Sequence, residues 1–359
     1  MMIRTDMSTT QPCHRYEKLR GFLSRDDFNG FTGDELFIMQ FIKKGWGQDI
    51  AALSNMAEAL ANIAVDDADR QTEIAPLLTG VVERALHRKV NPYKKDINRV
   101  ATLGKYGYYL EHLNIILGSY QRVVDDAYQP LNLRITEHLL HASLAQDNAH
   151  APLLPHVKMR WSADQAAIIY SIWLYDQNNG TQLCDPLREK WLAYMQAHAT
   201  HPQTGLFITE VMGTQPYSKQ PRGCATAYLV HYTSRFAPEV AADQWQRFKK
   251  HMLVRRLGIT GFREYLPDYT GKWTPDSGPI IAGLGIAASG LALNAASSVG
   301  DEDTHRMLRR SVSPVLWLLR QFDRVPGLNR LSRVGTDLLA TSIYLNATTK
   351  TGWYAAEKL

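Results

Sequence analysis

Apolar and polar residues follow one another along this chain in long blocks whose spacing fits helices. Short breaks rich in Gly, Pro, Asn and Asp separate the blocks. A few extended pieces, such as 205–211 and 263–266, are expected to form hairpins, and no larger sheet is expected. We predict helices over residues 33–44, 48–65, 71–88, 106–126, 130–146, 162–179, 185–199, 223–236, 240–255, 278–299, 302–323 and 333–349.

The predicted helices are of two alternating kinds. Segments such as 110–124 and 164–175 are poor in charge and apolar on nearly every side, whereas 186–199 and 301–319 are amphipathic. A helix that is apolar all round must be buried all round. The apolar helices recur about every 55–60 residues. This pattern predicts an all-α (α/α)6 barrel, a double-layered helical toroid with an inner ring of helices inside an outer ring.

The composition supports a single globular unit. Hydrophobic residues make up 45% of the 359 residues and charged residues 21%. Because no Pro- or Ser-rich linker interrupts the pattern, we expect one barrel domain over 17–359 after a flexible segment, 1–16. The net charge of +5 is spread along the chain, which argues against nucleic acid as a partner.

Cysteine usage and the N-terminal residues bear on the compartment. The three cysteines are widely spaced, so neither a disulfide framework nor a structural metal site is expected. The first residues, MMIRTDMSTTQP, lack the apolar core of a signal peptide, and a cytoplasmic location follows as the expectation. The apolar run 279–298 is rich in Gly and Ala, which favours a buried helix over a membrane span.

Polar and aromatic residues gather where the apolar helices begin, and in a toroid those starts surround one end of the central funnel. His112, Asp164 and Asp276 are the candidate catalytic residues. A buried carboxyl group can have its pKa raised towards neutrality and donate a proton, while a second carboxylate or a His accepts one. The candidate substrate-binding residues, which include the aromatic wall of the cavity, are Tyr108, Glu111, Trp161, Cys224, Tyr228 and Trp273.

Several of these candidate residues could also have a purely structural role. His112 could be an ordinary core side chain, and Asp164 and Asp276 could cap the helices that follow them. The N-terminal position of Cys224 on its helix predicts a lowered thiol pKa, although a buried cysteine is more often inert.

The segment YYLEHLNIILGSYQRVV (108–124) resembles an inner helix of bacterial linalool dehydratase-isomerase, which also has His-Leu-Asn before an apolar run and Gly. The layout of 161–253 and the run DSGPIIAGLGIAASGLAL (276–293) are similar too. This resemblance covers about 45–350 and implies an (α/α)6 barrel that interconverts a small terpene alcohol, its isomer and an alkene without a cofactor. It makes His112 the active-site histidine. The family's pair of cysteines is not matched, because their places fall near Pro155 and on Asp164.

The leading hypothesis is a cofactor-independent, metal-independent lyase or isomerase of the dehydratase type, acting on a small, largely apolar substrate. In it, Asp164 is the acid, His112 the base or an orienting group, and Asp276 a second carboxylate. One alternative is a carbohydrate-active enzyme, a glycoside hydrolase or polysaccharide lyase, which the 8 Trp and 17 Tyr favour slightly. Another is a non-catalytic helical scaffold, and a homo-oligomer is also possible.

Overall fold

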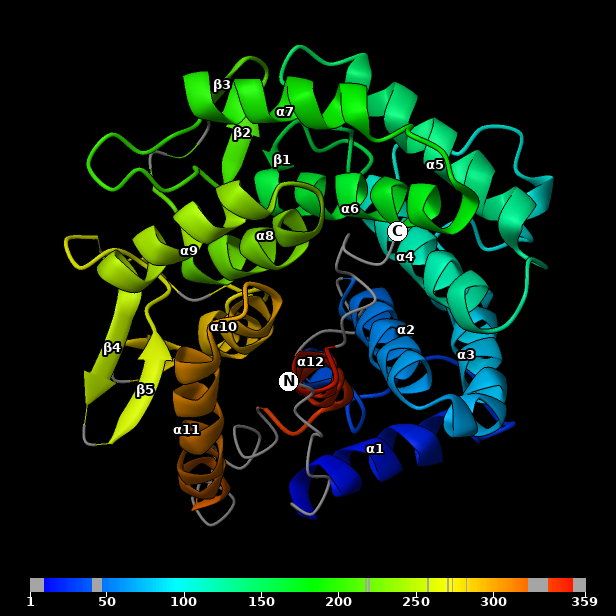
Figure 1. Ribbon diagram of the computed structural model, residues 1–359, viewed down its shortest axis with the longest axis horizontal. Helices are drawn as coiled ribbons and strands as arrows, with labels where there is room; N and C mark the ends of the chain where they lie inside the picture. The colour runs from blue at the N-terminus through cyan, green and yellow to red at the C-terminus, as the bar shows by residue number, and fades with distance from the viewer. Residues whose placement is uncertain are drawn as a thin grey trace.

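The structure is a computed structural model that describes residues 10–40, 47–216, 218, 220–256, 258–269, 271–272, 274–281, 283–321 and 335–350. These ranges contain helices α1 to α12 and seven short strands. The helices form two concentric layers around one axis (Figure 1). The predicted all-α (α/α)6 barrel is therefore confirmed, while the division at residue 16 stays a prediction.

The inner layer consists of the even-numbered helices. Each packs against the next one along the chain, and α12 packs against α2, so the ring closes. Their sequences are apolar on most sides because each one has helices on both flanks and an outer helix behind it. The inner helices are α2 (Gln48–Asp66), α4 (Gly107–Val123), α6 (Ser162–Asn179), α8 (Gly223–Phe236), α10 (Ile286–Ser298) and α12 (Leu338–Thr348).

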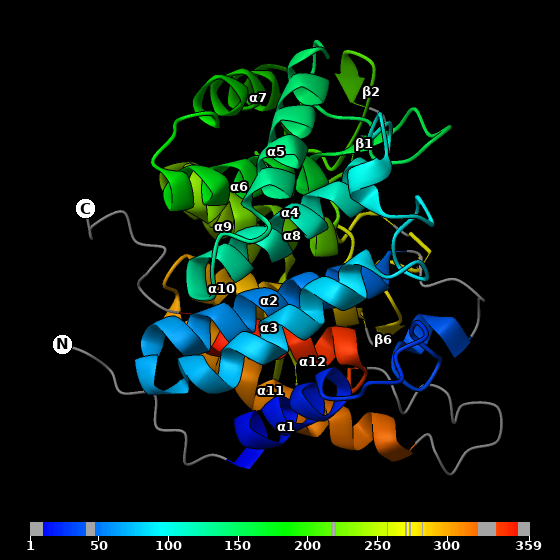
Figure 2. The same ribbon diagram turned by 90° about the vertical axis from the view of Figure 1, so that its right-hand side faces the viewer.

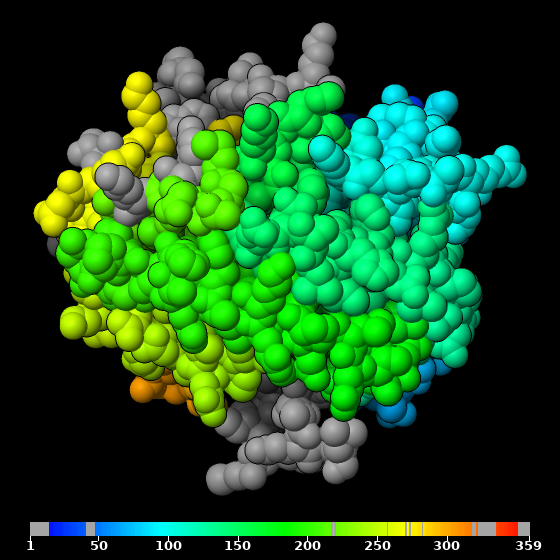
Figure 3. Space-filling view, turned by 90° about the horizontal axis from the view of Figure 1, so that it is seen from above, coloured from blue at the N-terminus to red at the C-terminus, as the bar shows by residue number. Residues whose placement is uncertain are grey.

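The outer layer consists of the odd-numbered helices, which bury one face against the ring (Figure 2). Figure 3 views the molecule from the side of α5 and α7, whose side chains form a continuous outer surface. These helices are α1 (Thr10–Leu23), α3 (Gln71–Leu86), α5 (Gln129–Leu144), α7 (Asp185–His198), α9 (Pro238–Met252) and α11 (Glu302–Gln321).

Helix α1 was not among the predicted helices. It packs against α12 and α3 and so covers the seam where the ring closes. Its buried residues Tyr16, Leu19, Phe22 and Leu23 lie at i, i+3, i+6 and i+7, which is a helical spacing hidden among many charged residues.

Four inner helices begin with the same backbone hydrogen bond. The first N–H of α4 donates to the carbonyl of Pro152 (3.1 Å), that of α6 to Thr209 (3.0 Å), that of α8 to Glu264 (2.8 Å) and that of α12 to Glu35 (2.8 Å). In each case the carbonyl lies in the segment that leads to the next inner helix. Since α2 follows Glu35, this bond also closes the ring. The bonds satisfy N–H groups that a helix start leaves without partners, and they hold the helix starts side by side.

Short antiparallel strands lie in the loops at this end of the barrel. β1 (Arg160–Trp161) pairs with β2 (Glu210–Met212), and β2 pairs with β3 (Gln215–Pro216). The remaining hairpins join β4 (Leu253–Arg256) to β5 (Ile259–Phe262) and β6 (Ile280–Ile281) to β7 (Leu284–Gly285).

These hairpins shorten two of the predicted helices. Ile280–Ile281 pair with Leu284–Gly285 in the β6–β7 hairpin, and Gly283 has φ +80°, so α10 begins at Ile286 instead of residue 278. Likewise α9 ends at Met252, where β4 starts. Of the predicted helix 33–44, the structure shows a 3-10 turn over Phe37–Gln40, and residues 41–44 lie outside the described part.

A buried carboxylate ties the inner ring together at its centre. Glu58 on α2 accepts hydrogen bonds from Tyr170 Oη on α6 (2.9 Å) and Asn346 Nδ2 on α12 (3.0 Å). Its Oε2 also lies 3.7 Å from His231 Nε2 on α8. Burial without these partners would cost several kcal/mol (about 3–5), so the pairing fixes how four inner helices meet.

Within the described residues, no helix combines the length and the apolarity that crossing a bilayer requires. Within the apolar run 279–298, residues 286–298 form the inner-ring helix α10, whereas β6 and β7 replace the first part of the buried helix that was expected over the whole run.

Candidate active site

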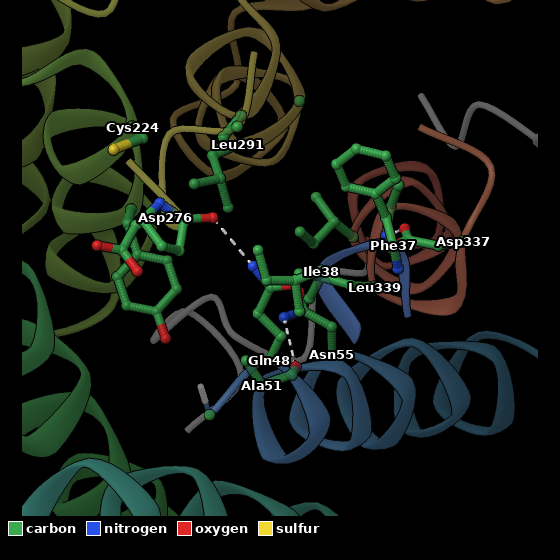
Figure 4. A pocket seen from close by; sticks show the side chains of 18 of the residues that line it. Phe37, Ile38, Gln48, Ala51, Asn55, Cys224, Asp276, Leu291, Asp337 and Leu339 are labelled. Atoms are coloured by element: carbon green, nitrogen blue, oxygen red, sulfur yellow. Dashed lines mark hydrogen bonds between the residues drawn. The ribbon is translucent and has the colours of Figure 1, made fainter. Parts of the chain in front are cut away.

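A cavity of about 1130 Å³ lies at the end of the barrel where the inner helices begin. Figure 4 shows Asp276 and Cys224 on one side of it and the first turns of α2 and α12 on the other. His112 and Glu111 lie behind the cavity wall, and Trp273 lies outside the described residues. The expected site residues that line the cavity are Tyr108, Trp161, Asp164, Cys224, Tyr228 and Asp276.

Three acidic residues meet beside the cavity. Burial and the nearby charge of Asp276 raise the pKa of Asp164 to about 7. Burial and the charge of Asp164 raise the pKa of Glu111 well above its usual value. Burial also raises the pKa of Asp276, although Arg222 offsets part of that rise. Because like charges this close together cannot all ionise, the cluster retains a proton near neutral pH that it can donate.

The capping interpretations of Asp164 and Asp276 do not hold. Trp161 occupies the N-cap position of α6, and no side chain caps that helix start. Helix α10 has Gly285 at its N-cap, well beyond Asp276 in the chain. Neither carboxyl group is therefore needed as an N-cap, whereas Asp337 does cap α12 through Ala340 N at 2.9 Å.

His112 is buried one layer behind the cavity. Its Nε2 lies 3.2 Å from Tyr228 Oη, and its ring meets the ring of Tyr108 edge-on at 5.0 Å. Burial lowers the pKa of His112 to about 3, so the imidazole is neutral at physiological pH. This position suits orienting Tyr228, and of the two roles expected for His112 the geometry favours orientation over direct proton abstraction.

Cys224 belongs to a polar cluster at the start of α8. Glu264 accepts a hydrogen bond from Cys224 N (3.1 Å) and from Cys224 Sγ (3.1 Å), and its Oε1 lies 3.0 Å from Arg222 Nε. Arg222 also donates to Thr274 Oγ1 (2.7 Å). Burial and the charge of Glu264 raise the pKa of the Cys224 thiol well above its usual value. The lowered thiol pKa expected from the helix N-terminus is therefore wrong, because the adjacent carboxylate and burial outweigh the helix dipole.

Two charged residues of the cavity wall, Asp49 and Arg222, were not among the expected site residues. Asp49 lies in the first turn of α2, and burial raises its pKa. Both residues sit at the start of an inner helix. The rule that selected Asp164 could therefore have selected them too.

Gly47 allows Tyr108 to lie against the start of α2. It has φ +81°, and a Cβ at this position would overlap the Tyr108 ring. Tyr108 Oη is 3.4 Å from the Gly47 carbonyl. A glycine is thus required here both for its backbone conformation and for space.

We expect Gly47→Ala to destabilise the fold by about 1–3 kcal/mol more than Gly104→Ala. Both glycines have positive φ, so both substitutions carry the same backbone penalty of about 1–2 kcal/mol. Only at position 47 does the added methyl group meet a side chain, whereas nothing lies near Gly104. Urea unfolding of the two variants measures the difference, and equal losses would show that Tyr108 does not pack there.

Among the described residues, no group of three or more His, Cys, Asp and Glu side chains is arranged to hold a metal ion. The acidic residues that line the cavity, Asp49, Asp164, Asp276 and Asp337, are spread over α2, α6, the loop before α10 and the N-cap of α12.

Comparisons with known proteins identify solved structures that have a similar fold. No known family model matches the sequence, and no curated protein matches it. A family 76 glycoside hydrolase from a bovine Bacteroides thetaiotaomicron strain superposes with a TM-score of 0.60 at 11% identity, over 95% of this chain and 77% of that chain. A family 76 glycoside hydrolase (mannosidase) from B. thetaiotaomicron gives 0.56 at 12% identity, over 95% and 97%. A sugar epimerase from a ruminal bacterium gives 0.54 at 13% identity, over 85% and 87%.

These neighbours overturn two sequence-based expectations. The resemblance to linalool dehydratase-isomerase is contradicted, because the similar structures are glycoside hydrolases and a sugar epimerase. The leading hypothesis of a dehydratase-type lyase or isomerase acting on a small apolar alcohol is contradicted with it. The apolar run of 108–124 is what an inner helix of this barrel needs, and together with the short His-Leu-Asn match it carried information about the fold and not about the reaction.

Proposed function

We propose that this chain is a carbohydrate-active enzyme that hydrolyses a glycosidic bond in the central cavity. The observation that carries the proposal is the buried carboxyl cluster of Glu111, Asp164 and Asp276 at the cavity wall. Glycoside hydrolysis generally needs two carboxyl groups in different protonation states. The glycoside hydrolases among the structural neighbours support the same choice.

Asp164 is the proposed general acid. With its pKa raised to about 7, it keeps a proton at neutral pH that it can give to the leaving oxygen. Asp276 is the proposed carboxylate partner, because Arg222 favours its ionised form. It would act on the sugar or on a water molecule from the other side of the bond. Burial and the charge of Asp276 keep Asp164 protonated, whereas Glu111, whose own pKa burial and Asp164 raise well above its usual value, lowers the pKa of Asp164 and offsets part of that rise.

Aromatic residues would hold the sugar. Trp161, Tyr108 and Tyr228 line the cavity beside the carboxyl cluster. Their faces can stack on the C–H groups of a pyranose, and their polar atoms can bond to its hydroxyl groups. Tyr228 Oη faces His112, which fixes its orientation.

A hydrolysis screen tests the proposal. The purified protein is incubated with mannobioses of each linkage and with other disaccharides, and new reducing ends are counted. Mannosides come first because one structural neighbour is a mannosidase. Release of reducing sugar that is absent from a heat-inactivated sample supports the proposal. An unsaturated product would indicate a lyase. If none of the disaccharides is cleaved, the proposal is contradicted.

The pH profile of kcat/KM should report the raised pKa of Asp164. The acid must be protonated, so activity is expected to fall about tenfold per pH unit above pH 7, since the pKa of Asp164 is about 7. In Asp276→Asn the falling limb should remain but shift to lower pH, because the residual activity still depends on Asp164 and the charge of Asp276 contributes to its raised pKa. A rate that stays constant up to pH 9, or one that already falls near the usual carboxyl pKa of about 4, would show that Asp164 is not the acid.

A further inference from the structure

The cavity continues well past the carboxyl cluster. From Asp276 it extends beyond Leu291 on α10 to Phe37 and to Leu339 on α12 (Figure 4). We call this second part the apolar chamber and define it by the side chains that line it, which are Phe37, Ile38, Leu291, Val312, Leu339 and Ile343.

The apolar chamber lies between inner helices, where packed side chains are normally expected. Leu291, Leu339 and Ile343 lie on inner helices, yet they are only half-buried. Gly290, in the second turn of α10, is exposed and lines the same cavity, and a Cβ added there would meet no atom within 4 Å. Among the described residues, these inner-helix surfaces face the cavity instead of a neighbouring side chain.

Two polar side chains of the cavity wall, Asn55 and Asp337, are already bonded within the chain. Asn55 donates to Ala51 O (3.0 Å) and accepts from Asn346 Nδ2 (3.1 Å). Asp337 accepts from Phe37 N (2.9 Å) and Ala340 N (2.9 Å). Since these groups are committed to internal bonds, the chamber presents mainly hydrocarbon to an occupant.

The size of the cavity also exceeds what a sugar needs. Pockets for drug-sized ligands occupy about 300–1,000 Å³, and this cavity, at about 1130 Å³, lies above that range. One or two pyranose rings at the carboxyl end would leave the apolar chamber empty.

We propose that the substrate is an amphiphilic glycoside whose alkyl or similar hydrocarbon group occupies the apolar chamber while its sugar lies at the carboxyl cluster. The proposal rests on the proposed function for the position of the sugar. The new element is the chemical class of the aglycone. Because the apolar chamber and the carboxyl end are parts of one cavity, a hydrocarbon group attached to the sugar fits better than an unrelated apolar partner. Burial of each methylene group strengthens binding about fourfold.

Binding of octyl and methyl α-D-mannopyranoside, measured by calorimetry with the full chain, tests the proposal. If half of the seven additional methylene groups are buried, the octyl compound should bind about 10²-fold more tightly. Gly290→Leu places a side chain into the chamber at a helix position that tolerates leucine better than glycine. It should abolish the octyl advantage without lowering the melting temperature.

Gly21→Leu is the matched control. Gly21 lies in α1, is exposed, has open space around its Cα and does not line the cavity, so this variant should keep the octyl advantage. Equal affinities for the two mannosides, or an octyl advantage that survives Gly290→Leu, would overturn the proposal. If no glycoside is hydrolysed but the advantage is present and lost in Gly290→Leu, hydrolysis fails as the function and the apolar chamber stands.

Discussion

Asp164→Asn is expected to lower kcat/KM for the hydrolysed glycoside by about 10²–10⁴-fold, the usual contribution of a general acid. The amide has nearly the same shape as the carboxyl group but has no proton to give to the leaving oxygen. Steady-state kinetics with the substrate found in the screen measures the loss.

The same variant should fold as well as the wild type. A carboxyl group with a pKa raised from its unfolded value to about 7 binds its proton more tightly in the native state, so its contribution to stability declines as the pH rises through that window. An amide has no such dependence. The melting temperature of Asp164→Asn at pH 8 should therefore equal or exceed that of the wild type.

Asp185→Asn provides the matched control. Asp185 occupies the first turn of α7, as Asp164 does on α6, but it lies on the outer layer and its side chain is 45% exposed. Its substitution should leave kcat/KM unchanged. Unfolding of Asp164→Asn, or equal activity in the two variants, would mean that Asp164 is a structural residue.

Glu264→Ala is expected to lower the free energy of unfolding by about 3–5 kcal/mol. The Glu264 carboxylate bonds to Cys224 N, Cys224 Sγ and Arg222 Nε, and its side chain is fully buried. Truncation leaves the Arg222 guanidinium with Thr274 at 2.7 Å and with Glu210 at the longer distance of 3.9 Å. The cost comes mainly from a buried charge that has lost its principal partner. Urea unfolding monitored by circular dichroism measures it.

Glu189→Ala controls for the loss of a surface carboxylate. The Glu189 side chain is 75% exposed and lies 3.8 Å from Arg188, so its removal should change stability by less than about 0.5 kcal/mol. A loss below about 1 kcal/mol in Glu264→Ala would mean that water replaces the carboxylate beside Arg222.

The fold could be predicted from the sequence because alternation between fully apolar and amphipathic helices has few physical solutions. A helix such as α6, apolar on nearly every side, needs neighbours all around it. The start of α10 was misplaced since the run 279–298 is apolar throughout, and hydrophobicity does not distinguish the β6–β7 hairpin from a helical turn. Helix α1 was missed because four buried residues among many charged ones give only a weak periodic pattern.

The cavity residues could be predicted in part for the same geometric reason. Inner helices begin at one end of the barrel, so Asp164 and Tyr228 could be assigned to a common site. Sequence position does not reveal depth, and His112 lies one layer further from the cavity than expected. The sequence also does not indicate which residues far apart in the chain contact each other. The carboxylate of Glu264, 40 residues from Cys224, adds to the effect of burial in raising the pKa of that thiol.

The reaction could not be predicted from residue patterns of the barrel itself. The segment 108–124 contains the features that packing demands of an inner helix, and these recur in barrels with different chemistry. The contents of the cavity, and above all its carboxyl cluster, are what distinguish one such enzyme from another.

A crystal structure of Asp164→Asn with the intact glycoside tests the account most directly. The glycosidic oxygen is predicted to lie about 2.6–3.2 Å from the side chain at position 164, with Trp161 or Tyr108 against the sugar and Asp276 near the bond to be broken. A sugar bound outside this cavity, or bound with its glycosidic bond turned away from position 164, would contradict the account.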